Sequence, residues 1–212
     1  MRSRSGLWDL VADTVADLLS LVLPLDCVGC GGESGSGRDG RGLCAACLAA
    51  ILGPARRRDP TPCPAGLPPC VAVSAYDGAV RSALLSLKEH GMWSLARPLG
   101  RALARSVEGC REQCAEGGVG GGAGGDAHDR GVVLIPVPSS RAAIRARGDD
   151  PLALVTSHAV RMLRRSGVQV DVIPTLVLAR RRRDQSGLDS RARLANLAGA
   201  FVAGRHVARL HD

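Results

Sequence analysis

Hydrophobic positions near the start of the chain repeat at the spacing of a helix. Between residues 6 and 23, leucine and valine recur every three or four positions, while three aspartates share another face. This pattern predicts an amphipathic helix that ends at Pro24. The aspartates interrupt the apolar core that a signal peptide needs, and Asp26 stands where a lipoprotein signal would place a small residue before Cys27. We therefore expect a cytoplasmic protein.

The periodicity disappears over residues 25–70, where glycine, proline and cysteine dominate, and it returns at Val71. A segment with so few apolar side chains cannot build a core of its own and needs a stabilising cross-link such as a metal ion or a disulfide. The alternation VAVSAY then predicts a strand over 71–76. We expect a helix after it that ends near Gly91, and another helix over 95–108.

The last third of the chain has the pattern of an α/β unit. The apolar run over 132–138 predicts a buried strand that leads into a loop. Asp150 and Pro151 are suited to the N-cap and first position of a helix, which Gly167 would close. A second apolar stretch follows over 170–179. Strand, helix and strand in this order predict a parallel pair.

Glycine dominates residues 117–125, which contain the formal pattern GxGxxG at 120–125. A dinucleotide-binding fingerprint must follow a strand and open a helix, whereas this one precedes a strand. We interpret the stretch as a loop.

Charge is distributed unevenly along the 212 residues. There are 28 lysines and arginines against 20 aspartates and glutamates, and the whole excess of +8 lies in residues 131–212, which hold 14 arginines and six aspartates. All but one of the cations are arginine, the side chain suited to bidentate phosphate contacts. Only four aromatic residues are present, which argues against folds that stack bases on aromatic side chains. No apolar run is long enough to span a bilayer.

Four of the eight cysteines form two CxxC pairs. Cys27 and Cys30 are separated from Cys44 and Cys47 by 13 residues that are rich in glycine. Two such pairs can turn four thiolates toward one point, which is the ligand set of a structural zinc site without an open catalytic position. Disulfides, redox chemistry and incidental thiols are the alternatives, although a cytoplasmic location disfavours disulfides.

The other four cysteines have weaker patterns. We expect Cys63 and Cys70 to be unliganded or auxiliary. Cys110 and Cys114 have helical spacing, and we expect them to be packed or exposed, with a second metal site as the alternative.

Five strings occur in one order along residues 15–203: LVLPLDCVGC, CAAC, AYDGAVRSALLSLKEHG, VVLIPVPSSRAAIRARGDDPLA and RRRRDQSGLDSRARLANLAGAF. Together they resemble the ComF family of competence proteins, which are phosphoribosyltransferase-like and carry an N-terminal zinc ribbon. The resemblance implies a type I phosphoribosyltransferase-like α/β fold with a parallel sheet. It divides the chain into an N-terminal helix (1–24), a four-cysteine zinc ribbon (25–70) and an α/β domain (71–212) with a glycine-rich loop over 115–130.

The resemblance also implies roles for individual residues. The two CxxC pairs match the family's zinc ligands. Further matches fall in a lysine-bearing segment, in the loop after the first sheet strand, in the basic segment after that loop and in a flexible segment further on. They imply contacts to phosphate, pyrophosphate or nucleic acid by Lys88, Pro136, Val137, Pro138, Ser139, Ser140, Arg141, Arg145, Arg147, Arg181, Arg182, Arg183, Gln185 and Arg191. Solvated surface charge is the alternative for Lys88 and for the arginine run over 180–183.

The chain departs from the family in two places. Asp149, Asp150 and Pro151 stand where the family has Phe-Asn-Gln. Family members also bind phosphoribosyl pyrophosphate (PRPP) with an apolar strand, an acidic pair and a Thr/Gly loop that cradles the 5-phosphate. This element should follow shortly after Phe201, but the chain continues VAGRHVARLHD to Asp212. We expect a C-terminally incomplete sheet, with Mg²⁺ and PRPP bound only if a complete site existed; no catalytic residue is assigned.

Three functions are compatible with these features. The first is a ComF-like phosphoribosyltransferase-family protein without full transferase activity in this form. The second is a zinc-ribbon component of DNA uptake that binds single-stranded DNA or proteins of the competence machinery. The third is an inactive remnant with exposed sheet edges.

Overall fold

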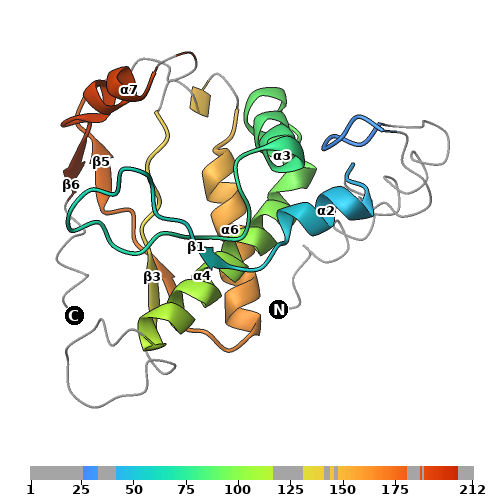
Figure 1. The fold of residues 1–212 in the computed structure, drawn as a ribbon, viewed down its shortest axis with the longest axis horizontal. Helices are drawn as coiled ribbons and strands as arrows, with labels where there is room; N and C mark the ends of the chain where they lie inside the picture. The colour runs from blue at the N-terminus through green and yellow to red at the C-terminus, as the bar shows by residue number, and fades with distance from the viewer. Residues whose placement is uncertain are drawn as a thin grey trace, which may run out of the picture. The chain divides into compact units, whose positions relative to one another are not determined.

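The structure is a computed structural model that describes residues 26–32, 42–116, 131–140, 144–145, 148–180, 187 and 189–204. The chain divides into two compact units, Met1–Gly122 (unit 1) and Ala123–Asp212 (unit 2). Figure 1 shows their helices and short strand pairs, a mixture that is compatible with an α/β class. The expected helix over 6–23 and the glycine-rich stretch over 117–125 lie outside the described residues.

Unit 1 begins with a short helix and a short strand pair. α2 (Ala45–Ile51) buries the side chains of Cys47 and Ile51. β1 (Arg56–Arg57) and β2 (Val71–Ala72) are antiparallel, with Arg57 opposite Val71. β1 has no signal in the sequence, because its two exposed arginines have no apolar alternation and pair with a strand 14 or more residues away.

Two longer helices complete unit 1. α3 (Gly78–His90) ends at Gly91, whose φ of 63° lies in the left-handed region that favours glycine. The short helix η1 (Trp93–Leu95) leads into α4 (Ala96–Glu116). α2 packs against both α3 and α4, and β2 packs against α4. The core includes the fully buried Leu43, Ile51, Leu95 and Pro98, and complete burial of one such large apolar side chain contributes about 1.5–3 kcal/mol.

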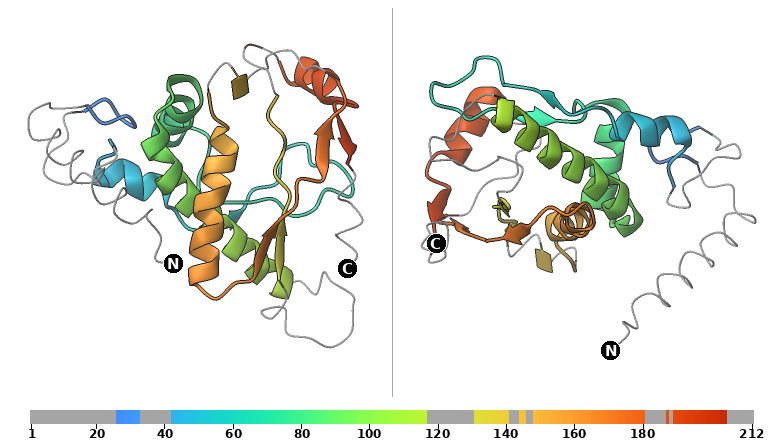
Figure 2. Two further views of the ribbon diagram at one scale, coloured as in Figure 1. Left: turned by 180° about the vertical axis from the view of Figure 1, so that it is seen from behind. Right: turned by 90° about the horizontal axis from the view of Figure 1, so that it is seen from below.

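Unit 2 contains the predicted strand–helix–strand unit. β3 (Val132–Leu134) and β4 (Val170–Val172) are parallel, and α6 (Pro151–Arg165) connects them and packs on β4 (Figure 2). The carboxylate of Asp150 accepts a hydrogen bond from the amide of Leu152 at 3.1 Å and so caps α6, as predicted. The buried face of α6 includes Ala159, Val160 and Leu163.

An antiparallel pair follows in unit 2. β5 (Leu176–Leu178) pairs with β6 (Phe201–Ala203), and α7 (Ser190–Leu197) lies between them in the chain. Asp189 caps α7 through a 2.7 Å hydrogen bond from the amide of Ala192.

Three predicted strands differ from the observed ones in length. The strand expected over 132–138 ends at Leu134, because Pro136 and Pro138 have no amide hydrogen for a ladder. The apolar stretch over 170–179 forms two strands, β4 and β5, with Pro174 between them. The strand expected over 71–76 ends at Ala72.

α4 is longer than the helix predicted over 95–108. It runs to Glu116, not to residue 108, and therefore carries Cys110 and Cys114. Gly109 permits a close approach within unit 1, since a Cβ there would overlap the Cβ of Ala55. None of the described helices is long and apolar enough to cross a membrane.

Candidate metal centre

The four cysteines of the two CxxC pairs lie together at the start of α2. Cys27 and Cys30 belong to a turn before this helix. Cys44 is the N-cap residue of α2, and Cys47 lies in its first turn. We call these four residues the cysteine tetrad.

Backbone hydrogen bonds shape the first CxxC pair. The amide of Gly31 donates to the carbonyl of Cys27 at 2.7 Å, and the amide of Cys27 donates to the carbonyl of Gly32 at 3.0 Å. The amide of Val28 donates to the carbonyl of Gly42 at 2.9 Å, which brings the first pair beside the segment that enters α2. Segments that are distant in sequence are thus joined through their main chains.

The sulfur positions fit a tetrahedral metal ion. The four Sγ atoms lie within 4.8 Å of one another, and those of Cys30 and Cys44 are 4.0 Å apart. Four thiolates at about 2.3 Å from a tetrahedral zinc ion would have sulfurs about 3.8 Å apart. Among the described residues, no other group of three or more cysteine, histidine, aspartate or glutamate side chains is arranged to hold a metal ion.

Backbone amides also stabilise negative charge on the tetrad. The amide of Cys44 donates to Cys27 Sγ at 3.2 Å, and the amide of Cys47 donates to Cys44 Sγ at 3.5 Å. Burial alone would raise the pKa of Cys27, but amide hydrogen bonds, that of Cys44 foremost, lower it to about 6. The pKa of Cys47 is raised, first by burial and then by contacts with the other three thiols. A cation at the centre would counter this crowding of thiolates.

The remaining cysteines do not extend the tetrad. Cys63 is exposed and Cys70 is half-buried, both in the loop between β1 and β2. Cys110 and Cys114 lie on α4, and the pKa of Cys110 is raised by burial and by the neighbouring Cys114. Cys110 is partly buried and Cys114 is exposed.

The predicted phosphate-binding residues are only partly within the described chain. Lys88 lies in the last turn of α3, exposed, with its Nζ 3.3 Å from Glu89 Oε1. Arg145 and Arg191 are exposed as well. The predicted residues outside the described chain are Arg141, Arg147, Arg181, Arg182, Arg183 and Gln185.

The loop after β3 lies beside the start of α6. It contains Pro136, Val137, Pro138, Ser139 and Ser140. The hydroxyl of Ser139 donates to the capping carboxylate of α6 at 3.0 Å, and that same carboxylate oxygen accepts the helix amide. A helix N-terminus attracts anions, and here a carboxylate of the chain itself takes that position.

The first member of the arginine run, Arg180, has a structural contact with the end of α7. Arg180 Nη2 donates to the carbonyls of Ala195, Asn196 and Ala198 at 3.2, 3.2 and 2.7 Å. It thereby satisfies carbonyls at the end of α7, which have no partner within the helix. The sequence does not predict this contact, because Arg180 and the end of α7 are 15–18 residues apart in the chain.

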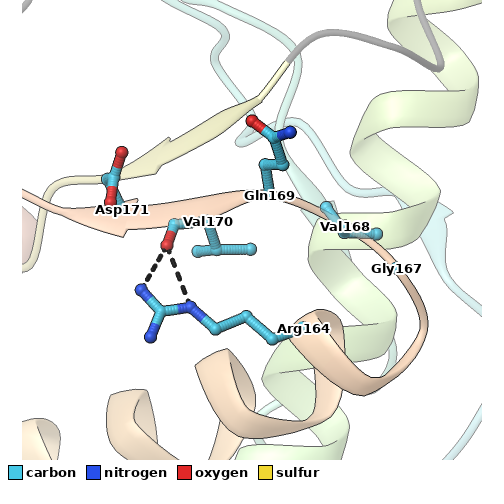
Figure 3. Close-up of a pocket in the computed structure, with 6 residues that line it drawn as sticks. All are labelled: Arg164, Gly167, Val168, Gln169, Val170 and Asp171. Atoms are coloured by element: carbon cyan, nitrogen blue, oxygen red, sulfur yellow. Dashed lines mark hydrogen bonds between the residues drawn. The ribbon is translucent and has the colours of Figure 1, made fainter.

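A shallow hollow of about 390 Å³ lies where α6 turns into β4 (Figure 3). Arg164 donates from Nε and Nη2 to the carbonyl of Val170 at 3.3 and 2.7 Å, so its guanidinium closes the turn. The hollow is lined by Arg164, Gly167, Val168, Gln169, Val170 and Asp171. None of the residues predicted to bind phosphate is among them.

No family model matches the chain, and neither the curated proteins nor the solved structures provide a match. The candidate metal site is therefore supported by the geometry of the cysteine tetrad alone. The resemblance to the ComF family stays a prediction.

Proposed function

We propose that the chain is a ComF-like protein of the phosphoribosyltransferase family whose cysteine tetrad holds a structural zinc ion. The observation that carries the proposal is the approach of four thiols to within 4.8 Å. Zinc accepts four thiolates in a closed tetrahedral set, which leaves no position for a substrate. Its role here is to join the turn of Cys27 and Cys30 to the N-terminus of α2.

Metal content tests the zinc centre directly. We expect the full chain, purified under reducing conditions, to contain one zinc per molecule. Cys44→Ser should lose the metal because it removes a ligand, whereas Cys114→Ser, which removes an exposed thiol on α4, should keep it. A full chain without zinc, or a C44S variant with normal zinc content, would contradict the proposal.

The phosphoribosyltransferase part of the proposal rests on the unit β3–α6–β4 and on the loop after β3. In open α/β sheets, ligands bind beyond the carboxyl ends of parallel strands, and Ser139 and Ser140 belong to the segment that follows the carboxyl end of β3. The 212 residues contain no apolar-Asp-Asp-Thr-Thr-Gly string, so we expect no release of pyrophosphate from PRPP. Steady release of pyrophosphate by the purified chain would overturn the assignment of an inactive form.

Charge favours a second candidate function, the binding of single-stranded DNA in DNA uptake. Residues 131–212 carry a net charge of +8, and Arg145 and Arg191 are exposed among them. Contacts from these arginines to phosphates would release counterions, so the affinity should fall steeply as salt rises.

A salt titration with a single-stranded oligonucleotide tests this second function. Arg145→Ala and Arg191→Ala should each weaken binding and reduce the slope of log affinity against log salt by about 0.7. Arg101→Ala removes the same charge from an exposed position on α4 and should leave both unchanged. Absent binding, or binding that does not respond to salt, would exclude this function.

A further inference from the structure

The loop between β1 and β2 contains two cysteines that the metal centre does not use. Cys63 is exposed and Cys70 is half-buried. Six residues separate them, and the segment over 60–69 contains five prolines. Prolines restrict the conformations of a loop, so its two thiols sample few separations.

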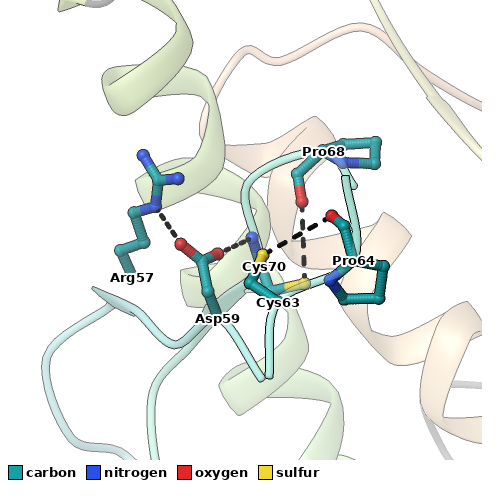
Figure 4. A network of polar contacts seen from close by, with 6 residues as sticks. All are labelled: Arg57, Asp59, Cys63, Pro64, Pro68 and Cys70. Carbon is teal, nitrogen blue, oxygen red and sulfur yellow. Dashed lines mark hydrogen bonds and ion pairs between the residues drawn. The ribbon is translucent and has the colours of Figure 1, made fainter. Parts of the chain in front are cut away.

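Hydrogen bonds join the two ends of this loop, residues 57–59 and Cys70 (Figure 4). The amide of Arg58 donates to the carbonyl of Cys70 at 2.7 Å, and the amide of Cys70 donates to Asp59 Oδ1 at 3.0 Å. Arg57 Nε lies 2.5 Å from Asp59 Oδ2. The amide of Cys70 and then Arg57 lower the pKa of Asp59, so its carboxylate stays charged and keeps these contacts. The backbone of Cys70 is therefore held next to residues 58 and 59, which follow β1 and precede Cys63 in the chain.

Both thiols point into the same bend of the loop. Cys63 Sγ donates to the carbonyl of Pro64 at 3.8 Å, and Cys70 Sγ donates to the carbonyl of Pro68 at 3.7 Å. Between these two carbonyls, the amide of Leu67 donates to Pro64 at 3.2 Å and folds the segment back on itself. Figure 4 shows the two side chains with the dashed lines that join their sulfurs to the carbonyls of Pro64 and Pro68. Rotation about each Cα–Cβ bond from one staggered position to another changes which atom a thiol faces.

We propose that Cys63 and Cys70 are an oxidative modification site, at which a low-molecular-weight disulfide converts the two thiols into one reversible intramolecular disulfide. The thiolate of the exposed Cys63 attacks the oxidant, which releases one of its halves as a thiol and leaves a mixed disulfide. The thiolate of Cys70 then attacks the sulfur of Cys63 and releases the second half. Two protein thiols are oxidised and one oxidant disulfide is reduced to two thiols.

The other cysteines are poorer partners for this chemistry. The tetrad is expected to be bound to metal, which lowers the availability of its thiolates. Cys110 and Cys114 are four residues apart on α4. Cβ atoms at this helical spacing are about 5–6 Å apart, whereas a disulfide needs about 3.5–4.5 Å. The loop has no such helical constraint.

Oxidised glutathione and mass analysis of the zinc-loaded full chain test the proposal. We expect a product lighter by the mass of two hydrogen atoms, with unchanged zinc content and a peptide link between Cys63 and Cys70. A thiol reductant should restore the starting mass. The link should be lost completely in Cys63→Ser and Cys70→Ser, and each variant should instead keep a glutathione on the remaining cysteine.

Cys114→Ser is the matched control, because it removes an exposed thiol elsewhere in unit 1 and should form the link as the unchanged chain does. Recovery of Cys63 and Cys70 as free thiols, or their linkage to other cysteines, would overturn the proposal. Zinc content is followed separately, so loss of the metal centre would be distinguished from failure of this pair to oxidise.

Discussion

Gly29, between Cys27 and Cys30, shows how closely the tetrad is packed. A Cβ at this position would lie 2.7 Å from Cys47 Sγ and 2.8 Å from Cys47 Cβ. The two CxxC pairs can approach each other in this way only because the first one has a residue without a side chain at its third position. The pattern CxxC predicts the ligands, but it does not reveal which intervening residue must be small.

Substitution of this glycine tests the packing. Gly29→Ala should weaken zinc binding by about 10–100-fold, the usual effect of displacing groups that orient a ligand, because it pushes on the sulfur of Cys47. Competition with a chromophoric chelator measures the affinity. Gly32→Ala is the control, since a Cβ there would lie 3.6 Å from Cys30 Sγ, an ordinary contact. Equal zinc affinities of Gly29→Ala and Gly32→Ala would show that Cys47 can move away from the added methyl group without loss of binding.

Asp150 caps α6 and also accepts a hydrogen bond from Ser139 through the same carboxylate oxygen. Asp150→Ala removes the cap of α6 and should cost about 1 kcal/mol, which would speed hydrogen exchange of the Leu152 amide several-fold. Asp150→Asn should retain most of the protection, because asparagine is an equally good N-cap. Native-state hydrogen exchange of the full chain measures both. Faster exchange in the asparagine variant than in the alanine variant would contradict the assignment of this carboxylate as the cap.

At the scale of elements, local chemistry predicted the end of α3 and the start of α6 better than the strands, whereas the end of α4 was predicted eight residues too early. The ends of α3 and α6 follow from Gly91, Asp150 and Pro151, whose effects act within one turn. Strand lengths depend on partners that are distant in sequence, and β1 has no local signal at all. The prolines after Leu134 could have been recognised as the end of β3, since a residue without an amide hydrogen cannot continue a ladder.

The contact between α4 and the segment before β1 makes a prediction about Gly109. Replacing glycine by alanine inside a helix ordinarily stabilises it by about 1 kcal/mol. Here the added methyl would overlap Ala55, so Gly109→Ala should instead destabilise unit 1 by about 1–3 kcal/mol, the usual cost of overpacking. Denaturant unfolding measures the change.

Glu112→Ala serves as the comparison for Gly109→Ala, because residue 112 is exposed on the same helix. It should change the free energy of unfolding by less than about 0.5 kcal/mol. A stabilising effect of the alanine at position 109 would show that the close approach to Ala55 is not maintained in solution.

For the whole molecule, the division into two units predicts an unequal response to metal removal. The tetrad belongs to unit 1, so a chelator should speed hydrogen exchange in α2 and the segments packed on it. Exchange in α6 and β4, which belong to unit 2, should be unchanged. Added zinc should restore protection. Equal loss of protection in both units would mean that they depend on one another for stability.

Much of the candidate site follows from sequence alone, because a CxxC pair brings its ligands close together through local geometry. The two CxxC pairs identified all four tetrad residues, and the structure brings them together. The contacts of Ser139 and Arg180 could not be predicted, because each depends on a helix end that only the folded chain places nearby.

The distribution of cysteines along the chain has a practical consequence for fluorescent labelling. All eight cysteines occur between residues 27 and 114, so every one belongs to unit 1 and unit 2 is naturally free of thiols. A maleimide dye will therefore report on unit 1 alone. If Cys63, Cys70 and Cys110 are replaced by serine and zinc holds the tetrad, Cys114 is the one reactive thiol of unit 1. One cysteine introduced at the exposed Ser166 of unit 2 would then add a second attachment point. Such a pair of fluorophores would allow the separation of the two units to be followed as metal or oligonucleotide is added.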